Sequence, residues 1–484
     1  MDKKTHHLAQ ALEELNELLG DRLSTGQAVR DHHSGDESWH EKRPPDAVCF
    51  ADSADEVSAI MKICSRHGIP VIPFGTGTGL EGGTVAPQGG ICIDVSQMNS
   101  ILKVNAEDMD CVVQPGVTRQ QLDRYLHDSG LFFPIDPGAD ASLGGMAATR
   151  ASGTNAVRYG TMRENVLSLK VVMADGSMVT TGQRARKSAA GYDLTHLFVG
   201  SEGTLGIIVE LTLRLHGRPE AISAARVCFD DIDGAVKTAI QTIQCGIPIA
   251  RVELLDAAQM QAINRYSRTS YAEKTTLFLE FHGSSASVKE QAQAVGEICA
   301  DLGGSGFEWT AYEEQRREMW DARHSAAYAA MAVKPAAKAY ATDVCVPISR
   351  LADCIRETRE DVRSGTRMPT FLLGHIGDGN FHYVFLVDPE DPSELEVVLQ
   401  LSERMVQRAI RMGGTCSGEH GVGLGKQKYL RLEFGETGLE LMRTLKSALD
   451  PHNLMNPGKL LPPGARPDDE NSSALTVAAE EFLR

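Results

Sequence analysis

The fold is decided by one glycine-rich stretch, Gly75-Thr76-Gly77-Thr78-Gly79-Leu80-Glu81-Gly82-Gly83, which follows a predicted strand at residues 70–73. Three of its glycines fit the G-x-G-x-x-G pattern of nicotinamide-binding folds, but that pattern needs a helix that opens at the last glycine. Residues 83–90 include Pro87 and end in two more glycines, so they cannot form that helix. The absence of a following Gly-Lys-Ser/Thr excludes a P-loop. The stretch is either plain loop or a turn whose N–H groups bind an anion, and five glycines in its first nine residues favour the second reading.

Two further segments, residues 134–163 and 200–208, are also dense in small and hydroxyl side chains. They predict irregular backbone wrapped around a ligand. Three such loops, far apart in the sequence, suit one long extended ligand better than three small ones.

A second set of residues suits a divalent metal ion. His375 and His382 flank the turn signal Asp378-Gly379, between two apolar runs that read as short strands. Glu419 and His420 follow in another glycine-rich loop. Two histidines and a carboxylate, with positions left open, are typical of a catalytic site that also holds water or substrate. The alternative is a set of histidines packed for structural reasons.

Composition limits the class of protein. The chain has 484 residues, of which 42% are hydrophobic and 23% charged, as in ordinary globular proteins. Its net charge of -17 argues against a nucleic-acid surface and against binding to anionic membranes. Its 10 cysteines include no Cys-x-x-Cys pair, which indicates reduced thiols. No apolar run reaches the roughly 20 residues of a membrane span, and the N-terminus resembles neither a secretion signal nor an Arg-rich transit peptide. We expect a cytoplasmic protein, with a peripheral place at the inner membrane as the alternative.

Alternating strand and helix patterns predict an α+β protein whose second half forms an antiparallel-sheet cap with helices on one face. The expected divisions are an N-terminal helix and linker (1–44), the binding domain (45–218), the cap (219–440), a return segment (441–461) and a tail (462–484). A single strand is expected at 340–346, and a short terminal helix at 474–482.

With these motifs in view, the chain resembles the FAD-linked oxidases of the vanillyl-alcohol oxidase and p-cresol methylhydroxylase superfamily. Within it, the chain is most similar to the D-2-hydroxyacid dehydrogenases. The match covers roughly residues 45–460, and the run Ala341-Thr342-Asp343-Val344-Cys345-Val346-Pro347-Ile348-Ser349 looks most like the D-lactate dehydrogenase branch.

The resemblance implies a two-part FAD-binding domain before the cap, in which FAD is bound by residues of all three loops and of the C-terminal return segment. These are Pro73, Gly75, Thr76, Gly77, Thr78, Gly79, Pro137, Gly138, Ser142, Gly145, Ser152, Gly153, Thr154, Glu202, Gly206, Ile208 and Asn456. Glu202 could instead be a helix-cap or turn residue. Many relatives attach FAD through a histidine in the first loop, but residues 73–84 contain none. Noncovalent FAD is therefore expected.

The resemblance also assigns the second set of residues. His375, His382 and Glu419 match the ligands of one divalent ion, zinc or manganese, and His420 matches the proposed base. Arg323 matches a clamp for the substrate carboxylate. The alternatives are a fourth ligand or a packed side chain for His420, and a surface salt bridge with Glu318 or Asp321 for Arg323.

The function implied is metal-assisted oxidation of D-lactate or a related D-2-hydroxy acid, with hydride transfer to flavin N5. Electrons would pass to a non-NAD acceptor such as cytochrome c, a quinone or an electron-transfer flavoprotein, and a homodimer is the expected assembly. Relatives specific for hydroxyglutarate have a basic residue just before the aspartate at position 343, where this chain has Ala341 and Thr342. Glycolate or D-2-hydroxyglutarate dehydrogenase remain alternatives. So do an oxidase, a non-redox flavoenzyme and a non-catalytic flavin-binding subunit.

Overall fold

The first glycine-rich loop leaves the edge of a small sheet at the N-terminal end of the molecule. The structure is a computed structural model that describes residues 3–463, so the helix expected at 474–482 lies outside the described residues. The sheet has the order β1-β2-β4-β3, with β2 and β3 parallel to β4. Its strands are β1 (Leu23–Ser24), β2 (Ala47–Phe50), β3 (Val71–Phe74) and β4 (Ile91–Asp94).

Helices α1 (Lys3–Leu19), α2 (Gln27–His32) and α3 (Ala54–His67) accompany this sheet. The hydroxyl of Ser53 accepts a hydrogen bond from the Glu56 amide and caps α3, which ends at Gly68 in a left-handed conformation. Apolar side chains of α1 share a buried cluster with α3 and the sheet. Helix α1 is therefore packed into the first domain, whereas Trp39, later in the same segment, donates to the carbonyl oxygen of Ala339 in the cap.

A second, antiparallel sheet completes the first domain, with the order β5-β6-β10-β8-β9. Its strands are β5 (Ile101–Asn105), β6 (Asp110–Val113), β8 (Val166–Val172), β9 (Met178–Thr180) and β10 (Ile207–Arg214), and β7 (Leu131–Phe132) pairs with β11 (His216–Gly217). Its helices are α4 (Arg119–Leu126), α5 (Leu143–Thr149), α6 (Ala156–Tyr159), α7 (Met162–Asn165) and α8 (Leu194–Phe198). The segment 134–163 is thus less irregular than expected, because Ser142 and Thr161 cap the short helices α5 and α7.

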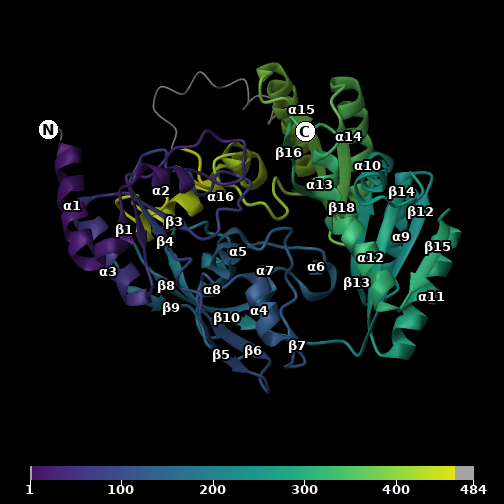
Figure 1. The fold of residues 1–484 in the computed structure, drawn as a ribbon, viewed down its shortest axis with the longest axis horizontal. Coiled ribbons are helices and arrows are strands. Elements are labelled where there is room, and N and C mark those ends of the chain that lie inside the picture. Colours follow the sequence, from purple (N-terminus) through teal and green to yellow (C-terminus); the bar gives the residue numbers. More distant parts are fainter. Residues whose placement is uncertain (1–2, 464–484) are drawn as a thin grey trace.

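The cap domain lies beside the first domain (Figure 1) and is built on an eight-stranded antiparallel sheet. Its order is β15-β12-β14-β13-β18-β19-β16, and β17 also pairs with β19. The strands are β12 (Ala221–Phe229), β13 (Ile249–Leu255), β14 (Thr275–Gly283), β15 (Ser305–Thr310), β16 (Lys338–Ala341), β17 (Val344–Cys345), β18 (Thr370–His375) and β19 (Asn380–Val387). The single strand expected at 340–346 is therefore wrong: Thr342 and Asp343 interrupt it.

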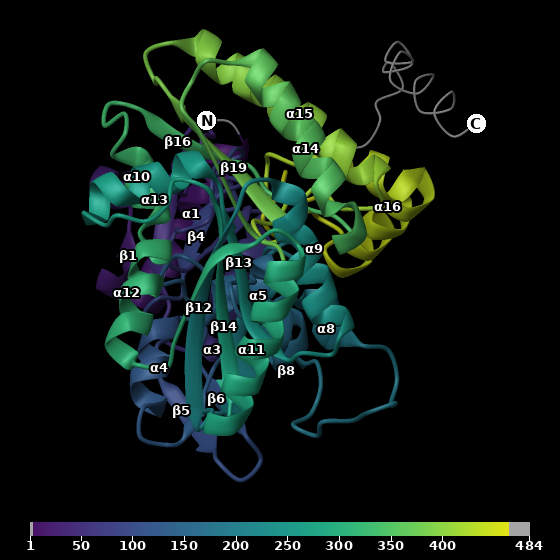
Figure 2. The same cartoon turned by 90° about the vertical axis from the view of Figure 1, so that its right-hand side faces the viewer.

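Helices cover both faces of the cap sheet, and the prediction of one covered face is wrong. The first face carries α9 (Ile232–Gln244), α11 (Ser285–Asp301), α14 (Leu351–Gly365) and α15 (Pro392–Arg411); the second carries α10 (Ala257–Ser267), α12 (Glu313–His324) and α13 (Ala326–Met331). Figure 2 shows α11 and α12 on opposite sides of the strands. Successive residues separate accordingly: Leu277 belongs to the first cluster and Phe278 to the second.

The second face of the cap sheet is apolar at one end and polar at the other. Polar side chains share this face at the end next to the first domain: Arg251, Glu253, Glu280, His282, His375 and His382. The apolar end lies under α10, α12 and α13. The polar end meets the first domain, where the Tyr159 hydroxyl lies 2.8 Å from His282 Nδ1 and Arg251 Nε donates to Asn155 Oδ1 at 2.9 Å.

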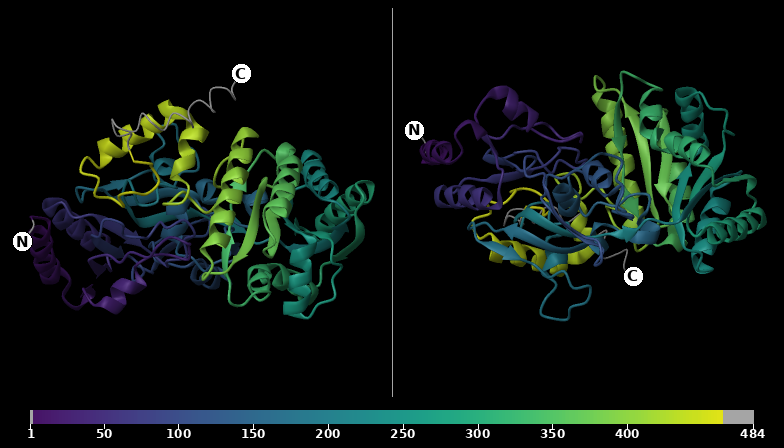
Figure 3. Two further views of the ribbon diagram at one scale, coloured as in Figure 1. Left: turned by 90° about the horizontal axis from the view of Figure 1, so that it is seen from above. Right: turned by 60° about the horizontal axis from the view of Figure 1, so that its bottom comes forward.

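The C-terminal segment returns to the first domain. Helix α16 (Leu430–Leu449) bends at Gly435, and Met455 then forms a parallel bridge with Val71 of β3. Figure 3 shows this segment, in yellow, against the N-terminal domain. The predicted boundary between residues 440 and 441 falls inside α16. Within residues 3–463, no helix has the length and apolar character of a membrane span.

Candidate active site

Two of the predicted metal ligands lie on one hairpin, as the turn signal indicated. His375 is the last residue of β18, His382 lies near the start of β19, and the tight turn between them contains Gly379 at φ +81°. A Cβ at Gly379 would lie 2.0 Å from the carbonyl oxygen of Val346, so the turn tolerates no side chain there. The hairpin places both imidazoles on the polar end of the cap sheet.

Both imidazoles carry a proton on Nδ1, because their Nδ1 atoms face only acceptors. Nδ1 of His375 donates to Glu253 Oε1 at 2.7 Å, and Nδ1 of His382 donates to the carbonyl oxygen of Thr342 at 2.9 Å. This leaves both Nε2 atoms facing Glu419 Oε1, at 3.1 and 3.3 Å. Without a cation, Nε2 of His375 can carry a proton and hydrogen-bond to Glu419. With both imidazoles neutral, the two Nε2 lone pairs and the Glu419 oxygen would face one point. A cation bound at that point would take the place of the proton on Nε2 of His375, and a hydrogen-bonded Nδ1 is the usual arrangement of a metal-ligating histidine.

The charges around this point are strongly coupled. Burial would raise the pKa of Glu419, but His375 and His382 hold that pKa well below its usual range. Burial would lower the pKa of His375, but Glu253 and Glu419 hold it well above. Glu419 is therefore a carboxylate, ready to bind a cation, and the predicted ligands are brought together by the structure.

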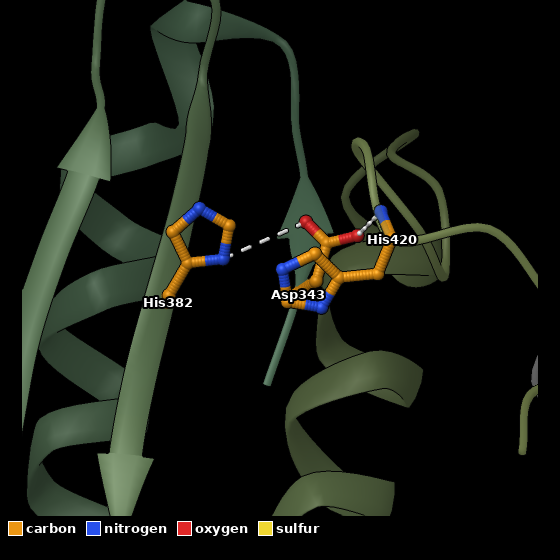
Figure 4. Close-up of side chains that lie close together, drawn as sticks. All are labelled: Asp343, His382 and His420. Carbon is orange, nitrogen blue, oxygen red and sulfur yellow. Dashed lines mark hydrogen bonds and ion pairs between the residues drawn. The ribbon is translucent and has the colours of Figure 1, made fainter. Parts of the chain in front are cut away.

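His420 lies over the same site. Its ring stacks on that of His382, with centroids 5.2 Å apart and planes 8° from parallel (Figure 4). Its Nδ1 is buried and has no hydrogen-bond partner among residues 3–463. Burial lowers the pKa of His420 to about 4, so the imidazole is neutral at pH 7. The structure thus places an uncommitted proton acceptor beside the three predicted ligands.

Arg323 is buried on α12 and forms no surface salt bridge with Glu318 or Asp321; that alternative is wrong. Its Nε and Nη2 donate to Glu253 Oε2 at 3.0 and 2.5 Å. Glu253 therefore links Arg323 to His375. Because the Nε edge of the guanidinium is taken, a substrate carboxylate would have to be met by its other edge. The predicted carboxylate contact stays a prediction.

The glycine-rich loops predicted to bind the cofactor lie together in the first domain. The Ser142 amide donates to Thr76 Oγ1 at 3.4 Å, which joins the first loop to the second. The third loop reaches the same place, since a Cβ at Gly203 would lie 2.7 Å from Pro73. Asn456 of the return segment donates to the carbonyl oxygens of Gly83 and Glu202, at 3.0 and 2.8 Å. Their convergence agrees with one extended ligand.

The second loop is closed on itself. Gly153 has φ +154°, and a Cβ there would lie 2.6 Å from the carbonyl oxygen of Asp136, while Thr154 donates to the Asp136 carboxylate at 2.9 Å. The backbone of Gly138 faces open space on its Cβ side. Such a backbone wall beside open space fits a flat cofactor. For the remaining predicted residues of these loops, Gly75, Gly77, Thr78, Gly79, Pro137, Gly145 and Ser152, contact with the cofactor stays a prediction.

Three residues predicted to contact the cofactor have structural roles in the protein. The Glu202 carboxylate accepts hydrogen bonds from the amides of Val422 and Gly423, both at 2.7 Å, and so ties the loop after His420 to the first domain. At Gly206 a Cβ would lie 2.4 Å from Val171, and Ile208 is buried in the core of the first domain. Their cofactor contacts stay predictions.

Sequence reasoning missed two buried carboxylates that organise the site. Glu253 bridges His375 and Arg323, and Asp343 accepts hydrogen bonds from the amides of Glu419 and His420. A signal for Glu253 was present: Arg251 and Glu253 place charges at alternate positions of a strand that is otherwise apolar. For Asp343, the polar pair Thr342-Asp343 inside an apolar run was the corresponding signal.

Two family models together cover most of the chain. Residues 45–182 match the model described as "FAD binding domain", and residues 218–460 match "FAD linked oxidases, C-terminal domain". The chain therefore belongs to the FAD-linked oxidases, a family of two-domain flavoproteins that bind FAD in the first domain.

Individual relatives are more specific. The chain is 54% identical, over 95% of its length and 93% of the relative's, to "Probable D-lactate dehydrogenase, mitochondrial" of Danio rerio. It is 45% identical to "D-lactate dehydrogenase [cytochrome], mitochondrial" of Arabidopsis thaliana, over 94% of this chain and 80% of that protein. In fold it is similar to p-cresol methylhydroxylase, with a TM-score of 0.80 at 18% identity over 94% of this chain and 97% of that structure. The resemblance inferred from the motifs is confirmed.

Proposed function

We propose that this protein oxidises D-lactate, or a closely related D-2-hydroxy acid, to the 2-oxo acid, with noncovalently bound FAD and one divalent ion, zinc or manganese. The relatives named as D-lactate dehydrogenases support the substrate class and the cytochrome-type acceptor. The single observation that carries the metal is the convergence of two histidine Nε2 atoms and a carboxylate oxygen on one point. Glycolate and D-2-hydroxyglutarate are the alternative substrates.

Each residue of the site has its own role in the proposed reaction. When bound, FAD would accept the two electrons, and the divalent ion would lower the pKa of the substrate hydroxyl. His375, His382 and Glu419 would hold the ion, and Glu253 and the carbonyl of Thr342 keep both histidines in the ligating tautomer. His420 would take the hydroxyl proton on its unpartnered Nδ1.

Arg323 would meet the substrate carboxylate with the edge of its guanidinium that Glu253 leaves open. A guanidinium fixes the orientation of a carboxylate as well as its charge. Its pairing with Glu253 adds a second effect, because its removal would leave a buried carboxylate half-compensated beside His375. Of the further details, a cytoplasmic location, the physiological electron acceptor and a homodimer stay predictions.

The substrate assignment is tested by mixing the purified flavoprotein anaerobically with D-lactate, L-lactate, glycolate and D-2-hydroxyglutarate. The chelating site and a fixed carboxylate contact together select one configuration at the α carbon. D-lactate should bleach the flavin absorbance fastest, and L-lactate slowly. Equal bleaching by both enantiomers would contradict the proposed pose, and faster bleaching by glycolate or D-2-hydroxyglutarate would replace D-lactate as the substrate.

Noncovalent attachment is tested by denaturation. Residues 73–84 offer no histidine for a flavin bond. Precipitation by acid or heat should release yellow flavin into the supernatant and leave a colourless pellet. Flavin that remains with the washed pellet would show a covalent bond through another residue.

A further inference from the structure

Strands β16 and β17 are separated by two polar residues, Thr342 and Asp343, at the centre of the cap. Both side chains are buried, with Asp343 only 1% exposed. A buried aspartate inside a strand region is costly unless its charge is compensated. The hydrogen bonds of Asp343 therefore indicate the role of the break between β16 and β17.

The Asp343 carboxylate forms hydrogen bonds with the loop that carries Glu419 and His420. Its Oδ2 accepts hydrogen bonds from the Ser417 hydroxyl at 2.9 Å, the Glu419 amide at 2.9 Å and the His420 amide at 3.0 Å. Figure 4 shows the contact with His420. The loop thus folds around one oxygen atom, and its two functional residues are anchored by their own amides.

The remaining contacts fix the carboxylate itself. Its Oδ1 accepts a hydrogen bond from Asn380 Nδ2 at 2.7 Å, and Lys426 Nζ lies 3.4 Å from Oδ2. Burial would raise the pKa of Asp343, but Lys426, His420 and His382 hold it well below its usual range. A Cβ at Gly418 would lie 2.1 Å from the Asn380 side chain, so the loop approaches as closely as a glycine permits.

Asp343 could instead be a metal ligand, because it lies with His382 and His420 in a group whose donor atoms are close enough to share an ion. The hydrogen bonds argue against that role. Five donors already contact its two oxygens, and the Nδ1 of His382 donates to the carbonyl oxygen of Thr342. The lone pairs left for a cation are those that face Glu419.

We propose that Asp343 is a positioning residue, which holds Glu419 in the ligand shell and His420 over the substrate. With the neighbouring carbonyl of Thr342 on His382, the interruption between β16 and β17 sets the orientation of three site residues at once. The inference rests on the proposed function, because it presumes that Glu419 binds a metal ion.

Asp343→Asn tests the inference with little change in shape. An asparagine amide must place its NH₂ group at one of the two former oxygen positions, and each position already faces a donor. At the Oδ2 position the NH₂ group would meet the three donors of the loop, and at the Oδ1 position it would meet the amide of Asn380. In either orientation the loop loses its charged acceptor, and hydrogen bonds to a neutral acceptor are weaker. In the FAD-loaded protein, a Mn²⁺ titration followed by electron paramagnetic resonance should show binding weakened roughly 10- to 100-fold. At saturating Mn²⁺, kcat should remain reduced with KM changed less, because the amide of His420 is then held by a weaker, neutral acceptor.

Asp450→Asn is the matched control. Asp450 is also buried and also accepts two backbone amides, from Leu454 and Met455, and a lysine, Lys446, but in the return segment. It should lose stability while its Mn²⁺ affinity stays at the wild-type value. Ser417→Ala is a milder second variant that keeps both amide contacts, and it should weaken Mn²⁺ binding by roughly three- to tenfold.

The outcomes separate the inference from the proposed function. Wild-type protein that binds no Mn²⁺ or Zn²⁺ would overturn the metal-assisted function and this inference with it. Wild-type binding together with unchanged Mn²⁺ affinity in Asp343→Asn would overturn the inference alone. Should Asp343→Asn fail to fold, Ser417→Ala decides: wild-type affinity in that variant overturns the inference. Weakened binding in the Asp343 and Ser417 variants, but not in Asp450→Asn, supports it.

Discussion

His420→Ala is expected to retain both FAD and the metal ion and yet to reduce its flavin roughly 100- to 10,000-fold more slowly than the wild type. That range is the usual effect of removing a general base. The expectation follows from the geometry: the ring stacks on His382, and its buried Nδ1 has no partner among residues 3–463. Stopped-flow absorbance with D-lactate, on samples whose metal content is measured, gives the rate.

His216→Ala provides the control for removal of an imidazole. Burial lowers the pKa of His216 to about 4, as for His420, but His216 lies in the first domain and hydrogen-bonds to Asn165. Its variant should reduce the flavin at a rate within a few-fold of the wild type. Loss of metal in His420→Ala would instead place His420 in the ligand shell and leave the base unassigned.

The hairpin that carries His375 and His382 was predictable because the residues that determine it are close together in the sequence. Turn chemistry between two apolar runs fixed the places of His375 and His382, and both lie where the pattern put them. The first loop was predictable for the same reason: the residues after it cannot form a helix, and none forms there.

The helices on the second face of the cap sheet were not predicted to lie there. Their sequences do not show a clear amphipathic pattern. Helix α12 is rich in charge, and only its Trp320, Ala322 and Arg323 are buried. One of those, Arg323, reaches its partner Glu253 across 70 residues of sequence. Such a pairing depends on the register of strands that lie far apart in the chain, and no local pattern reports it.

The interruption at Thr342 and Asp343 shows the same limit. An apolar run with two polar residues reads as one strand when only periodicity is weighed. In the structure those residues serve the loop at 417–420, which is distant in sequence. A conflict between local pattern and tertiary structure of this kind is expected at functional sites.

His382→Ala should lose the metal ion and, with it, turnover. Removal of a hydrogen-bond partner of a ligating histidine costs about 10- to 100-fold in metal affinity, so removal of the ligand itself should cost at least about 100-fold. FAD should stay bound, because the loops expected to hold it belong to the first domain and the return segment. Metal analysis and the flavin spectrum of the same sample test both statements. A variant that keeps its metal would show that the ion is held elsewhere.

The central claim is tested most directly by removing the metal from the unmodified protein. FAD-loaded protein is stripped with a chelator, mixed anaerobically with D-lactate, and followed at the flavin absorbance before and after Mn²⁺ or Zn²⁺ is added. The flavin should stay yellow in the stripped protein and bleach once the ion is restored, whereas stripped His382→Ala should stay yellow throughout. Bleaching at the full rate by demonstrably metal-free wild-type protein would contradict the metal-assisted oxidation proposed for this site.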